Sequence, residues 1–409
     1  MIITINEGSQ YVLFLLALAG EMEYNCLAKN TALSESYSQK VLRKMQKDKL
    51  IKKMTFIEDG QEKTLVRMRD KWAEGAVMKL SQELKLHYDL MVGKPKQRFK
   101  GSPAHKERIL KMGRLVQMFY ESGIQVDMLR HEHRPNDFGI ADMAQPGAGQ
   151  PYDMFASFLK EKTIFSSDGS LLSPEEIFSR LGSEQTCFFT SRALSNQRGQ
   201  RYKNSRNLMN RMYGILVSGR TFFNVYYVSA PGEIWWRDVE RQAMAITQRY
   251  RHTLYPDENV GEGAAIFYTP SPFVIHQIFF PPKKTQARIN PPDIYEKSYL
   301  LPLSENHIDI RTMLLVPNYK SKLKEVLLKE NAVSDEEYDG KMNGYETYIL
   351  LDSDMTKMAH LVPRLNTRSA IVVIHSWQKE ITKALYKDAR QIVFSAEEFE
   401  SLVEELQAV

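Results

Sequence analysis

Few side chains in this sequence have the types and spacing of a catalytic or metal site. His131 and His133 form the one His-x-His pattern of the chain. Two such rings project from the same side of a buried strand only if the residue between them is apolar, because side chains alternate along a strand. Here the middle residue is Glu132, and Pro135 follows shortly after. A polar loop is therefore favoured over a metal site.

The other acidic groups also have simpler interpretations. Asp352-Ser353-Asp354 follows an apolar run and could ligate a hard cation, but such residues more commonly form turns or helix caps. Glu83-Leu84-Lys85 lies within an expected helix, and Asp339-Gly340-Lys341 has the pattern of a turn. No glycine-rich phosphate loop is present. We therefore assign no catalytic residue and no metal ligand, and we expect no cofactor.

The strongest signal is a local excess of cations near the N-terminus. Between Gln39 and Lys53 there are seven lysines or arginines and one acid, Asp48. Tyr37, Val41, Leu42 and Met45 form an apolar stripe, which predicts a helix from Ser34 to Asp48. The opposite face has hydroxyl, amide and cationic groups that suit base edges and phosphates. We predict DNA contacts from Ser36, Ser38, Gln39, Lys40, Arg43, Lys44 and Lys47.

The flanking elements suit this assignment. Helices are expected at Glu7–Gly20 and Tyr24–Lys29, and strands at Leu50–Ile57 and Lys63–Arg69, joined by a tight turn that contains Asp59-Gly60. Three helices followed by such a hairpin predict a winged helix-turn-helix. The hairpin adds further predicted DNA contacts: Lys52, Lys53, Lys63, Arg67 and Arg69. The alternative is a module for protein interaction or dimerisation; the local charge favours DNA.

Glycine and proline residues in the sequence predict the domain limits. A helix from Lys71 to Met91 would either pair two subunits or pack onto the rest of the chain, and the sequence leaves both open. Residues 93–103 combine glycine, proline and cations, which is typical of a linker. We predict a DNA-binding domain over residues 1–92 that folds and binds without the rest, then an α/β domain over 104–282. Residues 283–409 are a second α/β domain or a continuation of the first.

Alternating helices and strands in the remainder predict an α+β or α/β multidomain protein. Helices are expected at Ala104–Ser122, Pro174–Leu181, Arg206–Val217 and Trp236–Arg251. Strands are expected at Ile124–Leu129, Thr186–Phe189, Phe222–Val228, Ala264–Tyr268, Val274–Phe280, Asp309–Val316, Glu346–Leu351 and Ala370–His375. Prolines 281–282 and 291–292 bracket a basic connection, and Ser395 with Glu398 predicts the cap of a last helix.

A second basic segment has no acid between Ser191 and Arg220. It either forms an auxiliary nucleic-acid surface or is a solvated face that pairs with acids elsewhere. The candidate residues are Arg192, Arg198, Arg201, Lys203, Arg206 and Arg211.

Composition sets the broad class. The chain has 409 residues, 43% of them hydrophobic, and a net charge of +5, so large buried cores are expected and disorder is not. Cys26 and Cys187 are too few for a disulfide framework or a structural zinc site. No membrane or export signal is recognised. These features are expected of a cytoplasmic protein.

The order of elements resembles a known group. The helix-rich N-terminus, the basic linker, Ser191-Arg192, Tyr213-Gly214-Ile215-Leu216 and Trp235 to Glu240 are similar to winged-helix proteins of Gram-positive plasmids and integrative elements, in particular the replication-relaxation family. The resemblance implies a double-stranded-DNA-binding protein of a mobile genetic element, which acts as a transcriptional regulator or as a replication or transfer accessory factor. It implies no catalytic residue. The alternative is a nuclease or relaxase that the winged helix delivers to its site. A homodimer, or a protein partner for the C-terminal region, would fit either.

Overall fold

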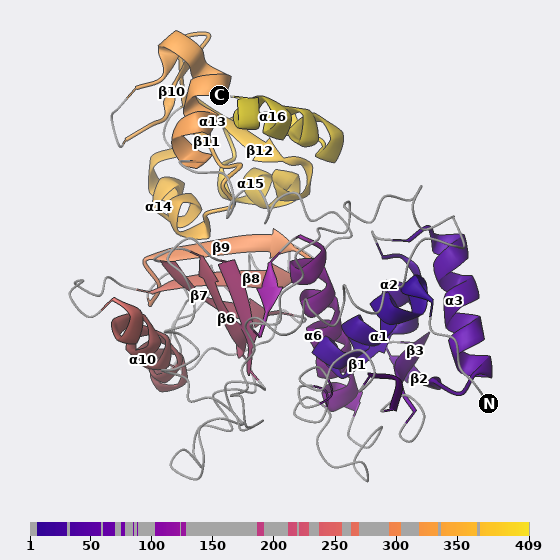
Figure 1. The fold of residues 1–409 in the computed structure, drawn as a ribbon. Helices are drawn as coiled ribbons and strands as arrows, with labels where there is room; N and C mark the ends of the chain where they lie inside the picture. Colours follow the sequence, from indigo (N-terminus) through magenta and orange to yellow (C-terminus); the bar gives the residue numbers. More distant parts are fainter. Residues whose placement is uncertain are drawn as a thin grey trace. The chain divides into compact units, whose positions relative to one another are not determined.

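The computed structural model describes most of the predicted N-terminal and C-terminal elements. The residues described are 6–30, 33–58, 60–69, 75–77, 85, 88, 103–122, 124–127, 186–191, 212–218, 221–228, 237–255, 263–269, 294–303, 319–333, 337–365 and 369–408. The chain divides into two compact units, Met1–Met209 and Asn210–Val409, which we describe separately (Figure 1). Both mix helices and strands, so the α+β class expected from the sequence is confirmed.

Three helices and a hairpin form the N-terminal elements at nearly the predicted bounds. In order they are α1 (Glu7–Ala19), β1 (Glu21–Glu23), α2 (Tyr24–Ala28), α3 (Glu35–Lys47), β2 (Ile51–Glu58) and β3 (Gln61–Met68). Asn6 caps the start of α1 by accepting from the Ser9 N–H, and Gly20 ends that helix with φ of 80°. Gly60 takes φ of 75° in the tight turn between β2 and β3, where a side chain would be strained.

Strand β1 was not predicted, because it is only three residues long. It pairs antiparallel with β3, so the sheet order is β1-β3-β2 and β3 is the central strand. Residues 65–68 of β3 are consequently buried on both faces. This burial departs from the alternation of buried and exposed residues expected for an edge strand of a hairpin.

Helix α1 is the centre of this core. Residues 12–18 are fully buried, and the helix contacts α3, β1, β3 and α6 (Pro103–Glu121). Tyr11 donates a hydrogen bond to Glu121 at 3.0 Å, and Gln117 donates to the Cys26 carbonyl at 2.9 Å. Helix α6 therefore packs on the N-terminal elements, although the sequence placed it at the start of the following domain.

Two short strands follow α6 in the first unit. β4 (Gln125–Val126) and β5 (Thr186–Thr190) pair in parallel, and Asp127 accepts hydrogen bonds from both the main-chain N–H and the hydroxyl of Thr190. The strand predicted at 186–189 is thus confirmed, whereas the one predicted at 124–129 forms over two residues.

The second unit begins with four neighbouring strands of a sheet, in the order β6-β7-β8-β9. β6 (Met212–Ser218) and β7 (Thr221–Tyr227) form a hairpin, β8 (Ala264–Thr269) and β9 (Lys297–Pro302) add in parallel, and α10 (Arg237–Leu254) packs against β7. The helix predicted over Arg206–Val217 is wrong from Met212 onward. Residues 212–217 are all buried, and a continuous apolar run of this length does not distinguish a buried strand from a helix.

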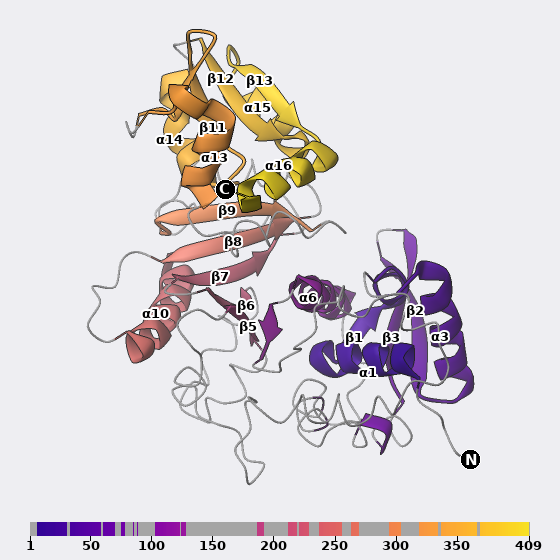
Figure 2. The same cartoon turned by 45° about the horizontal axis from the view of Figure 1, so that its top comes forward.

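The C-terminal elements form a three-layer α/β arrangement. They are α13 (Tyr319–Leu328), η7 (Lys329–Asn331), β10 (Gly340–Met342), β11 (Tyr345–Ile349), α14 (Met355–Leu365), β12 (Ala370–His375), η8 (Ser376–Gln378), α15 (Lys379–Leu385), β13 (Arg390–Phe394) and α16 (Ala396–Ala408). β11, β12 and β13 are parallel and adjacent, as Figure 2 shows, and β10 pairs antiparallel with β11. The turn expected at Asp339-Gly340-Lys341 is wrong, because Gly340 and Lys341 belong to β10.

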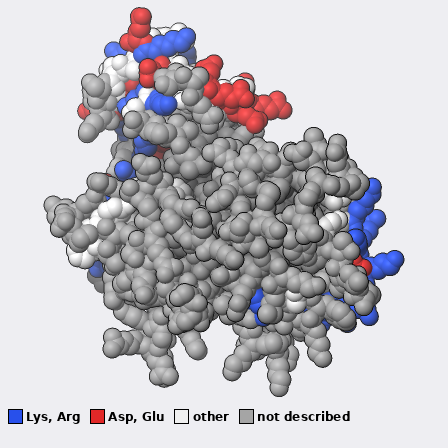
Figure 3. All heavy atoms as spheres, viewed as in Figure 1, with Lys and Arg blue, Asp and Glu red and all other residues white. Residues whose placement is uncertain are grey.

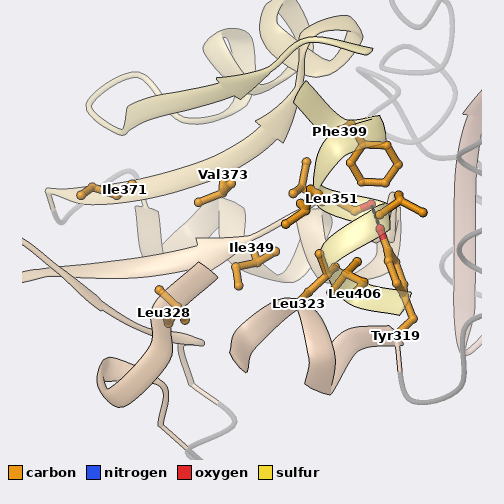
Figure 4. Packing of buried hydrophobic residues seen from close by; sticks show 11 residues of the cluster. Tyr319, Leu323, Leu328, Ile349, Leu351, Ile371, Val373, Phe399 and Leu406 are labelled. Carbon is orange, nitrogen blue, oxygen red and sulfur yellow. Dashed lines mark hydrogen bonds between the residues drawn. The ribbon is translucent and has the colours of Figure 1, made fainter. Parts of the chain in front are cut away.

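One face of this sheet packs against α13 and α16. Ile349, Ile371 and Val373 point from β11 and β12 into a cluster with Leu323 of α13 and Leu406 of α16 (Figure 4). The two crossover helices α14 and α15 share the opposite face, since parallel crossovers almost always have the same hand. The cap predicted for α16 is confirmed: Ser395 and Glu398 exchange hydrogen bonds with each other's main-chain N–H groups.

Other predicted elements lie outside the described residues. They are the helix at 174–181, the strands at 274–280 and 309–316, the proline-bracketed connection at 281–292, the linker at 93–102 and nearly all of the helix at 71–91. Across the part of the chain that is described, no helix combines the length and the apolar character needed to cross a membrane.

We predict that Gly113→Leu destabilises the first unit. A Cβ atom at Gly113 would lie 3.0 Å from the Glu21 carbonyl oxygen and 3.1 Å from Met22 Cγ, so a larger side chain must push α6 away from β1. The expected cost is about 1–3 kcal/mol of unfolding free energy, measured by urea unfolding. Gly75→Ala is the control, because a Cβ there meets nothing within 4 Å. An unchanged midpoint for Gly113→Leu would mean that α6 does not pack tightly on β1.

Candidate nucleic-acid interface

The outward face of α3 is strongly cationic. Ser36, Lys40, Arg43, Lys44 and Lys47 are exposed, and residues 41, 42 and 45 point inward. Figure 3 shows cations gathered over α3. The spacing of residues 36, 40, 43 and 47 puts them on the side opposite the buried stripe. The arrangement can bind a polyanion along about three turns of helix.

Asn30 fixes the end of α3 where the helix begins. Its amide nitrogen donates to the Leu27 carbonyl at 2.8 Å and to the Ser38 hydroxyl at 2.9 Å, and its amide oxygen accepts from the Leu33 N–H at 2.8 Å. Ser34 caps the helix by accepting from the Tyr37 N–H. Ser38 is therefore fully buried, and its predicted DNA contact is wrong: its hydroxyl joins α3 to the turn after α2.

Lys53 of the hairpin lies near α3, at the base of β2. Lys52, Lys63 and Arg69 are also half-buried, but Lys52 and Lys63 lie on the opposite face of the hairpin from Lys53, because side chains alternate along a strand, and Lys63 pairs with Phe56 near the tip. The Lys53 ammonium lies 3.8 Å from the centre of the Tyr24 ring. Burial lowers the pKa of Lys53, and repulsion from the Arg43 guanidinium lowers it further. This repulsion couples the hairpin to α3 electrostatically, and an anion bound between the two cations would relieve it.

Arg67 does not lie on this surface. It is 6% exposed on the central strand β3, opposite Glu21 of β1 in the register, so its predicted contact with DNA is also wrong. The physical reason is the unpredicted strand β1, which converts β3 from an edge strand into a central one. At the far end of the hairpin, Ile57 is 74% exposed and faces Glu62 across the strands.

Sequence reasoning missed one cation near the hairpin. The Lys106 ammonium of α6 lies 5.7 Å from the centre of the Phe56 ring on β2. The contact depends on the packing of α6 against the N-terminal elements, and no local pattern in the sequence indicates that packing.

One carboxylate lies among the polar side chains of α3. Glu35 is exposed in the first turn, and its Oε1 accepts a hydrogen bond from Gln39 Nε2 at 3.1 Å. Gln39 is half-buried, and its rotamer is thus held by a neighbour one turn away. The first turn of α3 differs in charge from the cationic turns that follow.

The second predicted basic surface, Arg192 to Arg211, lies outside the described residues, as does His131-Glu132-His133.

The acidic pair after β11 holds a loop. Asp354 caps α14 by accepting from the N–H groups of Thr356 and Lys357, and Asp352 accepts from the Asp354 N–H. Lys320 Nζ bridges the pair at 3.1 and 3.3 Å. The expected helix-cap role is confirmed. Within the described ranges, no cluster of three or more His, Cys, Asp or Glu side chains could hold a metal ion.

Burial and charge set the ionisation of this network. Burial raises the pKa of Asp352, but attraction to Lys357 and Lys320 outweighs it, so the pKa is lowered overall. Burial and the charge of Asp352 raise the pKa of Asp354. Burial lowers the pKa of Lys320, and the two carboxylates more than reverse this. The loop also binds the neighbouring sheet, since its Ser353 carbonyl accepts from the Leu300 N–H of β9 at 2.9 Å.

Comparisons with known proteins identify no relative. No protein-family model matches the chain, and the searches of curated proteins and of solved structures gave no significant match.

We predict that Asn30→Ala loosens the start of α3. The substitution leaves the Ser38 hydroxyl and the Leu33 N–H without their partner in a buried position, which costs about 1–3 kcal/mol for each unsatisfied group. Urea unfolding and amide exchange of α3 would measure the loss. Gln46→Ala, an exposed change on the same helix, is the control. Equal stability of the two variants would show that Asn30 does not hold the turn.

We predict a pH-dependent loss of stability for Lys320→Met. The raised pKa of Lys320 means that its contribution is complete below the ordinary lysine value of about 10.4 and declines as pH rises above it. The lowered pKa of Asp352 means that its contribution is present above about 4 and declines as pH falls. The free energy that protects the β11 amides from hydrogen exchange should therefore be lower in the variant than in the wild type by about 1–3 kcal/mol at pH 7. This difference between the two proteins should become smaller below pH 4.

Lys341→Met provides the control for this experiment, because Lys341 is exposed on β10. A constant difference across the whole pH range would contradict the electrostatic account of the loop.

Proposed function

We propose that the N-terminal elements form a winged helix-turn-helix and that the protein binds double-stranded DNA through it. In this proposal α3 is the recognition helix, and the β2–β3 hairpin is the wing. The element order α1-β1-α2-α3-β2-β3 and the antiparallel sheet β1-β3-β2 support it.

The observation that carries the proposal is the exposed cationic face of α3. Four cations, Lys40, Arg43, Lys44 and Lys47, project from a helix whose other face is fixed in the core. Lys53 of the hairpin, which is close enough to Arg43 for the two charges to repel each other, adds a cation beside this surface. A helix of this width fits the major groove, and flanking cations suit the phosphate backbone.

The biological setting is proposed from the sequence resemblance alone. By that resemblance the protein serves a mobile genetic element, as a transcriptional regulator or as a plasmid replication or transfer accessory factor. The described residues offer no observation that favours the nuclease alternative, since the acidic pair at 352 and 354 is used to hold a loop.

The proposal predicts how charge removal on α3 changes the salt dependence of binding. Replacing Lys40, Arg43 and Lys47 by serine in the full-length protein should weaken binding to duplex DNA. The slope of log K against log salt should become shallower by about 0.9 for each phosphate that the protein no longer neutralises. Fluorescence anisotropy at several salt concentrations measures both the affinity and the slope.

The matched control removes the same charge elsewhere. Lys379, Lys383 and Lys387 are exposed on and just after α15 in the second unit, and replacing them by serine also removes three positive charges. That variant should keep the wild-type slope. Identical slopes for the wild type and the α3 variant, or an equal change in both variants, would contradict the proposed interface.

A further inference from the structure

The first turn of α3 differs chemically from the rest of the exposed face. Residues 35–39 contribute a carboxylate, a hydroxyl and an amide, whereas the cations begin at Lys40. Phosphate contacts position a protein on DNA, and contacts to base edges specify the sequence. The division of α3 into an uncharged or acidic start and a cationic remainder therefore separates two tasks along one helix.

A carboxylate is costly on a surface that approaches phosphates. Glu35 lies about two turns from Arg43 on the same helix. Interaction with the helix dipole is enough to account for an acid in the first turn. Interaction with the helix dipole does not require the Glu35 side chain to contact Gln39. In the structure, however, Glu35 Oε1 accepts a hydrogen bond from Gln39 Nε2 at 3.1 Å. The hydrogen bond holds the Gln39 amide beside the carboxylate and leaves the amide oxygen and one amide N–H of Gln39 available.

We propose that Glu35 is a specificity-determining residue that accepts a hydrogen bond from the exocyclic amino group of a base in the major groove, with Gln39 reading the adjacent base. This inference rests on the proposed function of α3. A carboxylate only accepts hydrogen bonds, so it pairs with cytosine N4 or adenine N6 and repels guanine O6 and thymine O4. Gln39, with one donor and one acceptor still available, matches adenine N6 and N7.

The positions of the two residues suit this assignment. The N-terminal residues of a recognition helix are those that reach base edges. Asn30 and Ser34 fix this end of α3 through hydrogen bonds to Ser38, Leu33 and Tyr37. The pair is therefore presented from a firmly held part of the helix.

The test compares base preference in two isosteric variants of the full-length protein. Glu35→Gln replaces one carboxylate oxygen by an amide nitrogen, which can donate a hydrogen bond to guanine O6 or thymine O4. The variant should therefore also bind sites that have guanine or thymine at one position of the preferred sequence. Glu62→Gln, on the exposed part of β3, makes the same change of charge without the proposed contact. Preferences are measured by selection from a randomised duplex library, followed by anisotropy on the selected sites.

We expect Glu35→Gln to reduce discrimination at that one position by about tenfold and to leave the other positions unchanged. Glu62→Gln should raise affinity slightly for every duplex and change no preference. If Glu35→Gln behaves like Glu62→Gln, Glu35 acts only through its charge and the inference fails while DNA binding stands. If the wild type binds duplexes without sequence preference, the inference also fails. If the wild type binds no duplex, the proposed function itself fails.

Discussion

The burial of α1 on every side is the constraint on which the first unit depends. Residues 12–18 of this helix are fully buried, and each large aliphatic side chain so removed from water contributes about 1.5–3 kcal/mol. The helix needs α3, the small sheet and α6 around it at once. Gly8 permits the close approach of α3, since a Cβ there would lie 2.9 Å from Val41. Because the inner stripe of α3 is fixed in this way, its cations must face outward.

The outward charge of the protein is divided between distinct surfaces. Exposed cations cover α3, whereas α16 carries five glutamates and no cation. Figure 3 shows both groups. A polyanion is attracted to the first surface and repelled by the second. The small net charge of +5 conceals this separation, and for that reason the total charge of the chain says little about its partner.

The network around Lys320 shows how an acidic motif can serve structure. Two carboxylates that follow a parallel strand lie where α/β proteins commonly bind ligands. Here each accepts main-chain hydrogen bonds with one oxygen and pairs with the Lys320 ammonium through the other. The loop so held binds β9 through Ser353 and Thr356, and thereby joins the two sheets of the second unit.

The sequence by itself determined the elements whose signals are local. Caps and periodicity placed α1, α3 and α16 within a residue or two, and β12 coincides with its predicted run. The same local patterns predicted that Lys40, Arg43, Lys44 and Lys47 are exposed.

Tertiary structure decided the features that depend on residues distant in the sequence. β1 forms only because β3 is available to pair with it, and this pairing buries Arg67. Asn30 turns Ser38 inward, and β6 is a strand in which successive residues, 212–217, are all buried. Burial of these residues is a property of the assembled fold, and the spacing of residues within a single helix or strand does not predict it.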